Sequence, residues 1–178
     1  MNDIMSLYTH RLWKDHFVRT LNPGVPNSNM RILDVAGGTG DIAFRLLEHA
    51  TKLNNDSTAQ VRVVDINEKM LKFGRRKVEK GDMQNWQGRI EFEQGNAETL
   101  EGIADETIDL YTIAFGIRNV THIDRVLQSA YRVLKPGGVF ACLVYYFSRL
   151  FTDGRNSLNL QIPFSHRYIT VIRSHYYR

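Results

Sequence analysis

Residues 31–41 read RILDVAGGTGD, an apolar run that contains Asp34 and leads into a loop with three glycines. Directly after the loop, apolar residues recur at helical spacing. They are Ile42, Ala43, Leu46, Leu47 and Ala50. A strand, a glycine turn and a helix in this order form a nucleotide-binding corner, because glycines let the backbone turn sharply and let a ligand approach the main chain.

The residues around these glycines narrow the class of ligand. The loop contains no Gly-Lys-Ser/Thr sequence, which argues against a phosphate-binding Walker loop. Asp34 near the end of the strand instead suits a ligand with positive charge and hydrogen-bond donors, such as the amino end of S-adenosylmethionine (SAM). Residues 38–43 (GTGDIA) also fit the G-x-G-x-x-G/A dinucleotide pattern. The corner alone therefore leaves both SAM and NAD open.

Strand-like and helical patterns alternate along the chain. Apolar or alternating runs predict strands at 30–35, 61–65, 90–93, 108–115 and 139–143. Helical periodicity predicts helices at 1–20, 41–53, 68–80 and 121–134. The alternation predicts an α/β fold, a parallel sheet with helices on both faces. Ligands bind at the carboxyl ends of such strands, so the loops after the first four strands are expected to form one site.

Local signals add detail to these helices. Asn67 is the expected N-cap of the 68–80 helix, and Thr121, with Asp124 three residues later, is the expected N-cap of the last helix. The single cysteine, Cys142, lies in an apolar run and is expected in the core. The last helix is expected to bury one apolar stripe, formed by Ile123, Val126, Leu127, Ala130, Val133 and Leu134.

Composition excludes several classes of function. The 178 residues suit one domain, and no apolar run approaches the length of a membrane span. The net charge of +4 comes from residues 144–178, which contain five arginines and one acid, whereas the 18 basic and 18 acidic side chains of residues 1–143 cancel. The basic charge is therefore no evidence for nucleic-acid binding. The six histidines show no metal-ligand spacing, so no metal is expected.

Polar residues follow the later strands. A carboxylate at Asp65 can accept hydrogen bonds from the ribose diol that SAM and NAD share. Asn96 and Ala97 come after the third strand, where an amide can pair with an adenine edge. Arg118 follows the fourth strand and offers a fixed cation that can stabilise a phenolate or orient a water.

Several motifs together resemble the ubiquinone/menaquinone biosynthesis C-methyltransferase family. Residues 1–6 (MNDIMS), with His10 and Trp13, are similar to part of its N-terminal signature, and residues 132–140 (RVLKPGGVF) are similar to its later one. Further matches are the glycine corner, DIN at 65–67 and AFGIRNV at 114–120. The resemblance covers residues 1–143, is strongest to the mitochondrial members, and favours SAM over NAD.

The resemblance implies a class I SAM-dependent methyltransferase with a Rossmann-like sheet. It implies methyl transfer from SAM to an aromatic carbon of a polyprenylated methoxy-benzoquinol in ubiquinone biosynthesis. Arg118 would activate the quinol hydroxyl, and Tyr8 and His10, on a helical lid at about 1–20, would belong to the substrate wall. The cofactor would be held by Asp34, Gly37, Gly38, Thr39, Gly40, Asp65, Ile66, Asn96, Ala97 and Phe115.

The same resemblance implies a location and partners. It implies the matrix side of the mitochondrial inner membrane, with peripheral contact to the bilayer, although the chain shows no targeting segment. Other quinone-biosynthesis proteins are implied as partners, and the family is compatible with a homodimer.

Residues 144–178 depart from the family pattern. The family continues after Leu143 with Glu-x-Ser, whereas this chain has Val144-Tyr145-Tyr146 and then no clear period. We therefore expect a sheet that is incomplete at its C-terminal end, with an exposed strand edge. A truncated, catalytically inactive SAM-binding product, or a partner subunit of a quinone-synthesis complex, is the alternative function.

Overall fold

The computed structural model describes the backbone of residues 3–145 and 167–173 and the side chains of residues 11–144. Its six-stranded sheet has the order β3-β2-β1-β4-β5-β6. The first five strands are parallel, and β6 pairs antiparallel with β5. The strands are β1 (Arg31–Val35), β2 (Gln60–Asp65), β3 (Ile90–Gln94), β4 (Ile108–Ala114), β5 (Leu134–Tyr145) and β6 (Arg167–Arg173).

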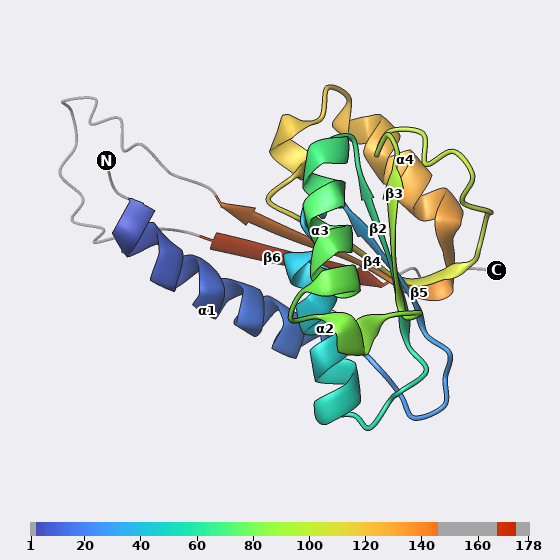
Figure 1. The fold of residues 1–178 in the computed structure, drawn as a ribbon. Coiled ribbons are helices and arrows are strands. Elements are labelled where there is room, and N and C mark those ends of the chain that lie inside the picture. The colour runs from blue at the N-terminus through green and yellow to red at the C-terminus, as the bar shows by residue number, and fades with distance from the viewer. Residues whose placement is uncertain (1–2, 146–166, 174–178) are drawn as a thin grey trace, which may run out of the picture.

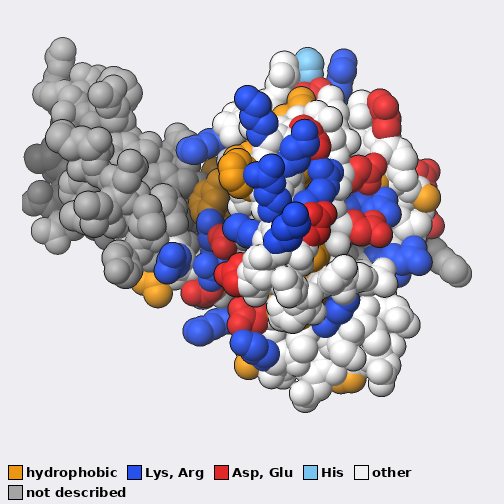
Figure 2. All heavy atoms as spheres, viewed as in Figure 1, with side chains coloured by type: hydrophobic (Ala, Val, Ile, Leu, Met, Phe, Trp, Pro, Cys, Tyr) orange, Lys and Arg blue, Asp and Glu red, His pale blue; other side chains and the backbone are white. Residues whose placement is uncertain are grey.

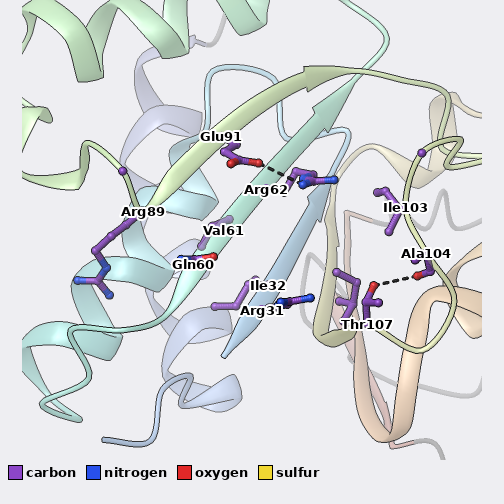
Figure 3. A pocket seen from close by; sticks show the side chains of 13 residues that line it. Arg31, Ile32, Gln60, Val61, Arg62, Arg89, Glu91, Ile103, Ala104 and Thr107 are labelled. Atoms are coloured by element: carbon purple, nitrogen blue, oxygen red, sulfur yellow. Dashed lines mark hydrogen bonds and ion pairs between the residues drawn. The ribbon is translucent and has the colours of Figure 1, made fainter. Parts of the chain in front are cut away.

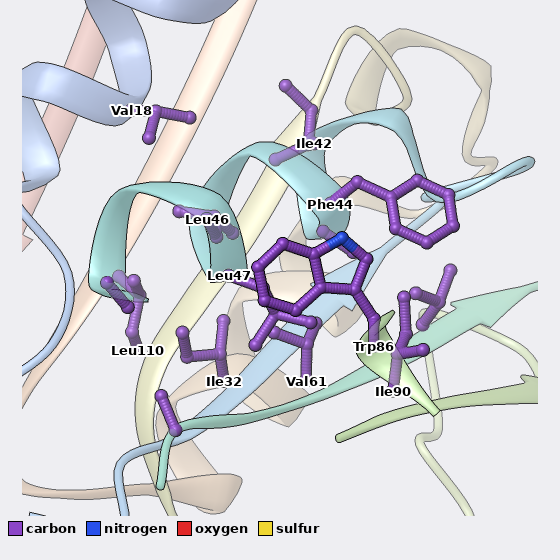
Figure 4. Packing of buried hydrophobic residues seen from close by; sticks show 14 of the residues in the cluster. Val18, Ile32, Ile42, Phe44, Leu46, Leu47, Val61, Trp86, Ile90 and Leu110 are labelled. Carbon is purple, nitrogen blue, oxygen red and sulfur yellow. The ribbon is translucent and has the colours of Figure 1, made fainter. Parts of the chain in front are cut away.

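Helices cover both faces of this sheet (Figure 1). On one face, a cluster of buried side chains joins the sheet to α1, α2 and α3, and Figure 4 shows Trp86 beside Phe44, Leu47 and Ile90. On the other face, a second cluster packs α4 against Tyr111 and Phe140. The helices are α1 (Asp3–Leu21), α2 (Asp41–Lys52), α3 (Glu68–Lys80) and α4 (Ile123–Val133), with short 3-10 turns η1 (Gln84–Trp86) and η2 (Ile117–Asn119).

The central strands are buried on both sides. Ile32 and Leu33 are consecutive in β1, yet Ile32 belongs to the cluster under α2 and Leu33 to the cluster under α4. Consecutive strand residues point to opposite faces, which explains why these strands read as nearly continuous apolar runs. The predicted parallel α/β sheet is confirmed, and Cys142 is buried as expected.

The last helix differs from its prediction at its start. Thr121 does not cap α4; the N-cap is His122, whose side chain makes no capping bond. The carboxylate of Glu98 accepts the backbone N–H of His122 instead. Ile123 and Leu127 are 48% and 44% exposed, because only the narrower stripe of Val126, Ala130 and Val133 faces the sheet.

The C-terminal part of the sheet also differs from expectation. β5 extends from Leu134 to Tyr145, beyond the predicted 139–143. β6 lies in the segment that has no periodic pattern, and it pairs with residues 139–145 of β5. The far edge of β5 therefore has an antiparallel partner, and the remaining edges of the described sheet are β3 and β6.

Helix α1 is tied to α2 by burial and charge. Phe17 and Val18 are buried in the cluster under α2. Lys14 Nζ lies 2.7 Å from Asp41 Oδ2, and Arg45 pairs with Asp15. Burial alone would raise the pKa of Asp41, but its contacts with Lys14 and Arg45 lower it. None of the helices in the described residues combines the length and apolar content needed to cross a membrane.

Candidate functional site

A cavity of about 290 Å³ opens at the carboxyl end of the parallel strands. Loops that follow β1, β2, β3 and β4 all contribute to its wall, so the site expected from the topology exists as one space. The lining residues are Val35, Ala36, Val64, Asp65, Ile66, Gly95, Asn96, Ala97, Glu98, Gly116, Asn119, Val120 and Thr121.

The glycine loop after β1 is held by Asp65. The Asp65 carboxylate accepts one hydrogen bond from the backbone N–H of Gly38 and another from that of Asn67, both at 2.8 Å. Gly38 and Gly40 have φ values of 56° and 79°, a region that favours glycine. Asn67 caps α3, as expected, by accepting from the N–H groups of Lys69 and Met70. Asp65 thus fixes both the loop and the start of the next helix.

Asp34 lies beneath the glycine loop and directly precedes Val35, which lines the cavity. Its side chain is fully buried, and Thr112 donates a 2.8 Å hydrogen bond to Oδ1. Oδ2 has no hydrogen-bond partner. A Cβ on Gly37 would lie 2.6 Å from this oxygen, so the loop passes directly over it. Burial raises the pKa of Asp34 to about 7, with smaller contributions from the neighbouring carboxylates; the bond from Thr112 and, more weakly, the backbone N–H of Ala43 oppose the rise.

The loop after β3 is fastened to the start of α4. Asn96 Oδ1 accepts the backbone N–H of Glu98 in a local turn, which leaves the amide NH₂ of Asn96 available. Glu98 accepts from the backbone N–H and from Nδ1 of His122, at 3.0 and 2.9 Å. Ser129 donates to the carbonyl oxygen of Glu98. These bonds set the distance between two walls of the cavity.

The loop after β4 approaches the glycine corner closely. Ala36 and Phe115 follow neighbouring strands and both have positive φ, 53° and 63°. Such backbone strain in non-glycine residues is concentrated at functional sites. Phe115 packs against the cluster under α2, and a Cβ on Gly116 would lie 2.3 Å from Ala36 Cβ. Arg118 is exposed, and its guanidinium has no hydrogen bond or ion pair within the described residues.

The structure brings together some of the predicted site residues. Asp65, Ile66, Asn96 and Ala97 line the cavity. Predicted residues outside its wall are Asp34, Gly37, Gly38, Thr39, Gly40, Phe115 and Arg118. Tyr8 and His10 lie in α1, and their side chains are outside the described part of the structure.

Glu98 also lines the cavity but was missed from the sequence, although it directly follows the predicted residue Ala97. Gly116, which directly follows the predicted residue Phe115, lines the cavity too. The described residues contain no group of three or more His, Cys, Asp or Glu side chains arranged for a metal.

A larger cavity, about 360 Å³, lies at the other end of the parallel strands, near the amino ends of β1 and β2 (Figure 3). Its arginines already have partners: Arg62 pairs with Glu91 at 3.2 Å, and the Arg89 guanidinium donates to Ala59 O and Thr51 Oγ1. Among the arginines that line this cavity, only the Arg31 guanidinium has no partner within the part of the chain that the structure describes. Ligands of parallel α/β sheets bind at the carboxyl edge, so the smaller cavity is the functional candidate.

Comparison with known proteins identifies the family of the chain. The model of the ubiE/COQ5 methyltransferase family matches residues 1–156. The chain belongs to this family. A mitochondrial 2-methoxy-6-polyprenyl-1,4-benzoquinol methylase from Schizosaccharomyces pombe is 60% identical over 145 residues, 82% of this chain and 47% of that protein. A ubiquinone/menaquinone biosynthesis C-methyltransferase UbiE from Rhodopseudomonas palustris is 48% identical over 89% of this chain and 58% of that protein.

The chain spans about half the length of the curated relatives that it matches. Among solved structures, a SAM-dependent methyltransferase from Aquifex aeolicus has a TM-score of 0.61 at 19% identity, covering 76% of this chain and 65% of that one. A geranyl diphosphate C-methyltransferase from Streptomyces coelicolor has a TM-score of 0.63 at 12% identity, covering 77% and 45%. At these identities, the two structural similarities show a shared fold only.

The ubiE/COQ5 family identifies SAM as the cofactor, and the residues present fit it. The buried Oδ2 of Asp34 is an unpartnered acceptor, which suits a ligand ammonium group. Asp65 uses its two oxygens for one N–H each and retains lone pairs for a diol. Asn96, in the loop after β3, lines the same cavity, and its amide NH₂ is available as a donor.

Proposed function

We propose that this chain is a SAM-dependent C-methyltransferase that methylates a polyprenylated methoxy-benzoquinol in ubiquinone biosynthesis. The proposal rests on membership of the ubiE/COQ5 family and on the name of the relative with 60% identity. The observation that carries it is the unpartnered Asp34 oxygen beneath a glycine loop. A dinucleotide pyrophosphate is negative and would be repelled there, whereas an ammonium group is attracted.

We assign the cofactor contacts residue by residue. Asp34 attracts the ammonium of the methionine portion, and the loop of Gly37, Gly38, Thr39 and Gly40 approaches that portion with its backbone. Asp65 accepts from the ribose hydroxyls. The adenine lies among Ile66, Asn96 and Ala97, with the Asn96 amide at its polar edge. Phe115, held at positive φ, shapes the floor near the methyl group.

The reaction requires a carbon nucleophile on the substrate ring. SAM, when bound, would supply an electrophilic methyl group: the bond from the ring carbon to the methyl would form as the methyl–sulfur bond breaks, S-adenosylhomocysteine would leave, and the ring carbon would then lose its proton to solvent. Arg118 would place a fixed positive charge beside the quinol oxygen as its proton passes to a water molecule, and so would stabilise the phenolate. Tyr8 and His10 on α1 are assigned to the substrate wall. The protein otherwise contributes orientation and exclusion of water.

The cellular setting belongs to the same proposal. The relative from Schizosaccharomyces pombe is named as mitochondrial, which supports a mitochondrial location. We propose the matrix side of the inner membrane, peripheral contact with the bilayer that holds the substrate, and association with other quinone-biosynthesis proteins. A homodimer is part of this proposal.

The test combines binding and turnover on the same protein. Titration calorimetry should show binding of SAM and S-adenosylhomocysteine and none of NADH. A short-chain polyprenyl methoxy-benzoquinol, kept reduced, should then gain one methyl group by mass spectrometry. Arg118→Gln should abolish turnover while SAM binding persists, and Arg125→Gln, an exposed arginine on α4, is the matched control. SAM binding without turnover by the wild type would instead support the inactive or partner-subunit alternative, and NADH binding would contradict both.

A further inference from the structure

The solvent face of α3 carries a row of unpaired cations. Lys69, Lys72, Arg76 and Lys80 are exposed and follow one another at helical spacing of three and four residues, so they share one face. None of these side chains has a hydrogen bond or ion pair within the described residues. Figure 2 shows Lys and Arg side chains gathered over α3.

The other charged side chains on and beside α3 do not neutralise this row of cations. Arg75 pairs with Glu68 at 2.7 Å and donates to the carbonyl of Phe92. Lys77 lies over the Phe44 ring, 5.8 Å from its centroid. Glu79 is the one free acid on the helix, with Asp82 just beyond its end. The acids of the neighbouring strand β3 face Arg62, which pairs with both Glu91 and Glu93.

Large apolar side chains are exposed beside the same row. Ile66, Met70 and Phe73 are 73%, 41% and 57% exposed, and they lie at or just before the N-terminal half of α3. Ile66 also lines the cavity, and a Cβ on Gly38 would lie 3.5 Å from Met70 Cε. The apolar cluster therefore connects the cationic row to the mouth of the candidate cofactor site.

We infer that this face of α3, Lys69, Lys72, Arg76 and Lys80 with Ile66, Met70 and Phe73, binds the surface of an anionic lipid bilayer. The inference rests on the proposed function, because a polyprenylated substrate resides in a bilayer and has to reach the site from it. Each lysine or arginine near an anionic surface contributes favourably, and exposed apolar side chains insert at the boundary between headgroups and acyl chains.

The composition of the face favours a bilayer over an acidic protein. Protein interfaces are depleted of lysine in their buried centres, whereas three of the four cations here are lysines. Long lysine side chains can reach headgroup phosphates while the apolar residues next to them enter the lipid. Contact through this face brings the cavity mouth to the membrane surface, since Ile66 belongs to both.

Vesicle flotation of the whole chain tests this inference without substrate. Wild type should float with phosphatidylcholine vesicles that contain phosphatidylglycerol, should not float with pure phosphatidylcholine, and should detach at high salt. The triple variant Lys69→Gln, Lys72→Gln, Arg76→Gln should bind the anionic vesicles on the order of a hundredfold more weakly. Phe73→Ser should weaken binding several-fold and leave its salt dependence unchanged.

The control removes the same charge elsewhere. The triple variant Arg19→Gln, Arg31→Gln, Arg125→Gln changes exposed arginines on α1, β1 and α4 that also have no ion pair with any described residue. Equal loss of binding in this control, or no vesicle binding by wild type, would overturn the inference. Binding of polyglutamate as tight as that of anionic vesicles would show an acidic-protein surface instead. Calorimetry with SAM separates the two proposals. If the wild type binds SAM but does not bind vesicles, the membrane-binding inference is contradicted and the proposed function is not.

Discussion

Thr112 and Asp34 are direct partners in the parallel pairing of β4 with β1, and the Thr112 hydroxyl donates a 2.8 Å hydrogen bond to Oδ1 of Asp34. Both side chains are fully buried. Because Oδ1 has a hydrogen-bond donor and Oδ2 has none, the fold holds a buried, partly paired carboxyl under the glycine loop. A buried acceptor without a partner lowers the stability of the folded, ligand-free protein. It contributes favourably to binding when a cationic ligand supplies a donor.

The variant Asp34→Asn should separate stability from cofactor binding. It keeps the shape and the Thr112 partner but removes a buried charge, so the free energy of unfolding at pH 8 should rise by about 2 kcal/mol. SAM affinity should fall by at least about a hundredfold, because the ammonium loses its counter-charge. Chemical denaturation and titration calorimetry measure the two effects. A less stable variant with unchanged affinity would show that Asp34 is structural.

SAM affinity should depend on pH through the same carboxyl. Its pKa in the free folded chain is about 7, above the ordinary 3.8, so its contribution to stability is fully present below about pH 4 and is lost as the pH rises through 7. The cationic ligand prefers the ionised form. The Kd for SAM should therefore rise as the pH falls below 7, by up to about tenfold per pH unit, and level off as the pH approaches 8. Asp34→Asn should remove this dependence; a wild-type Kd that is constant from pH 5.5 to 8 contradicts it.

Features of the fold that depend on residues close together in the sequence were predictable. The Asn67 cap is one example, because the amide reaches N–H groups two and three residues away. Thr121 failed as a cap because the acceptor at the start of α4 comes from Glu98, 24 residues earlier. A sequence pattern contains no information about such a distant partner.

In the site, too, some features could be predicted from the sequence and others could not. The glycine corner and Asp65 could be placed on the correct edge of the sheet, because parallel strands bring their carboxyl ends together. The burial of Asp34 could not be predicted, since it depends on the register of β1 with β4. Strand β6 could not be predicted for a similar reason, because its pairing with β5 defines it rather than an alternating sequence pattern.

The contact between Gly116 and Ala36 should tolerate no added methyl group. Gly116 has an ordinary φ of −77°, so its substitution is limited by space alone. A Cβ would lie 2.3 Å from Ala36 Cβ, and Gly116→Ala should lower the free energy of unfolding by about 1–3 kcal/mol and weaken SAM binding.

Ala36→Gly provides the matched control for that clash. It removes the opposing methyl group at a residue with φ of 53°, where glycine is unstrained. The double variant should recover most of the stability lost in Gly116→Ala, which a double-mutant cycle by thermal or chemical denaturation measures. Additive effects of the two changes would show that the two residues do not press on each other.

The bonds from His122 to Glu98 should matter more for cofactor affinity than for the fold. Glu98 accepts twice from His122, so the loop after β3 and the start of α4 move together as two walls of one cavity. His122→Ala removes only the Nδ1 contact, whereas Glu98→Ala removes both and leaves the backbone N–H of His122, the N-cap residue of α4, without its acceptor. We expect the Kd for SAM to rise several-fold in His122→Ala and further in Glu98→Ala, with Glu98→Gln between them because its amide oxygen still accepts one N–H. Far-ultraviolet circular dichroism should stay unchanged in all three. If all three variants bind SAM as wild type does, the bridge has no role in shaping the cofactor site.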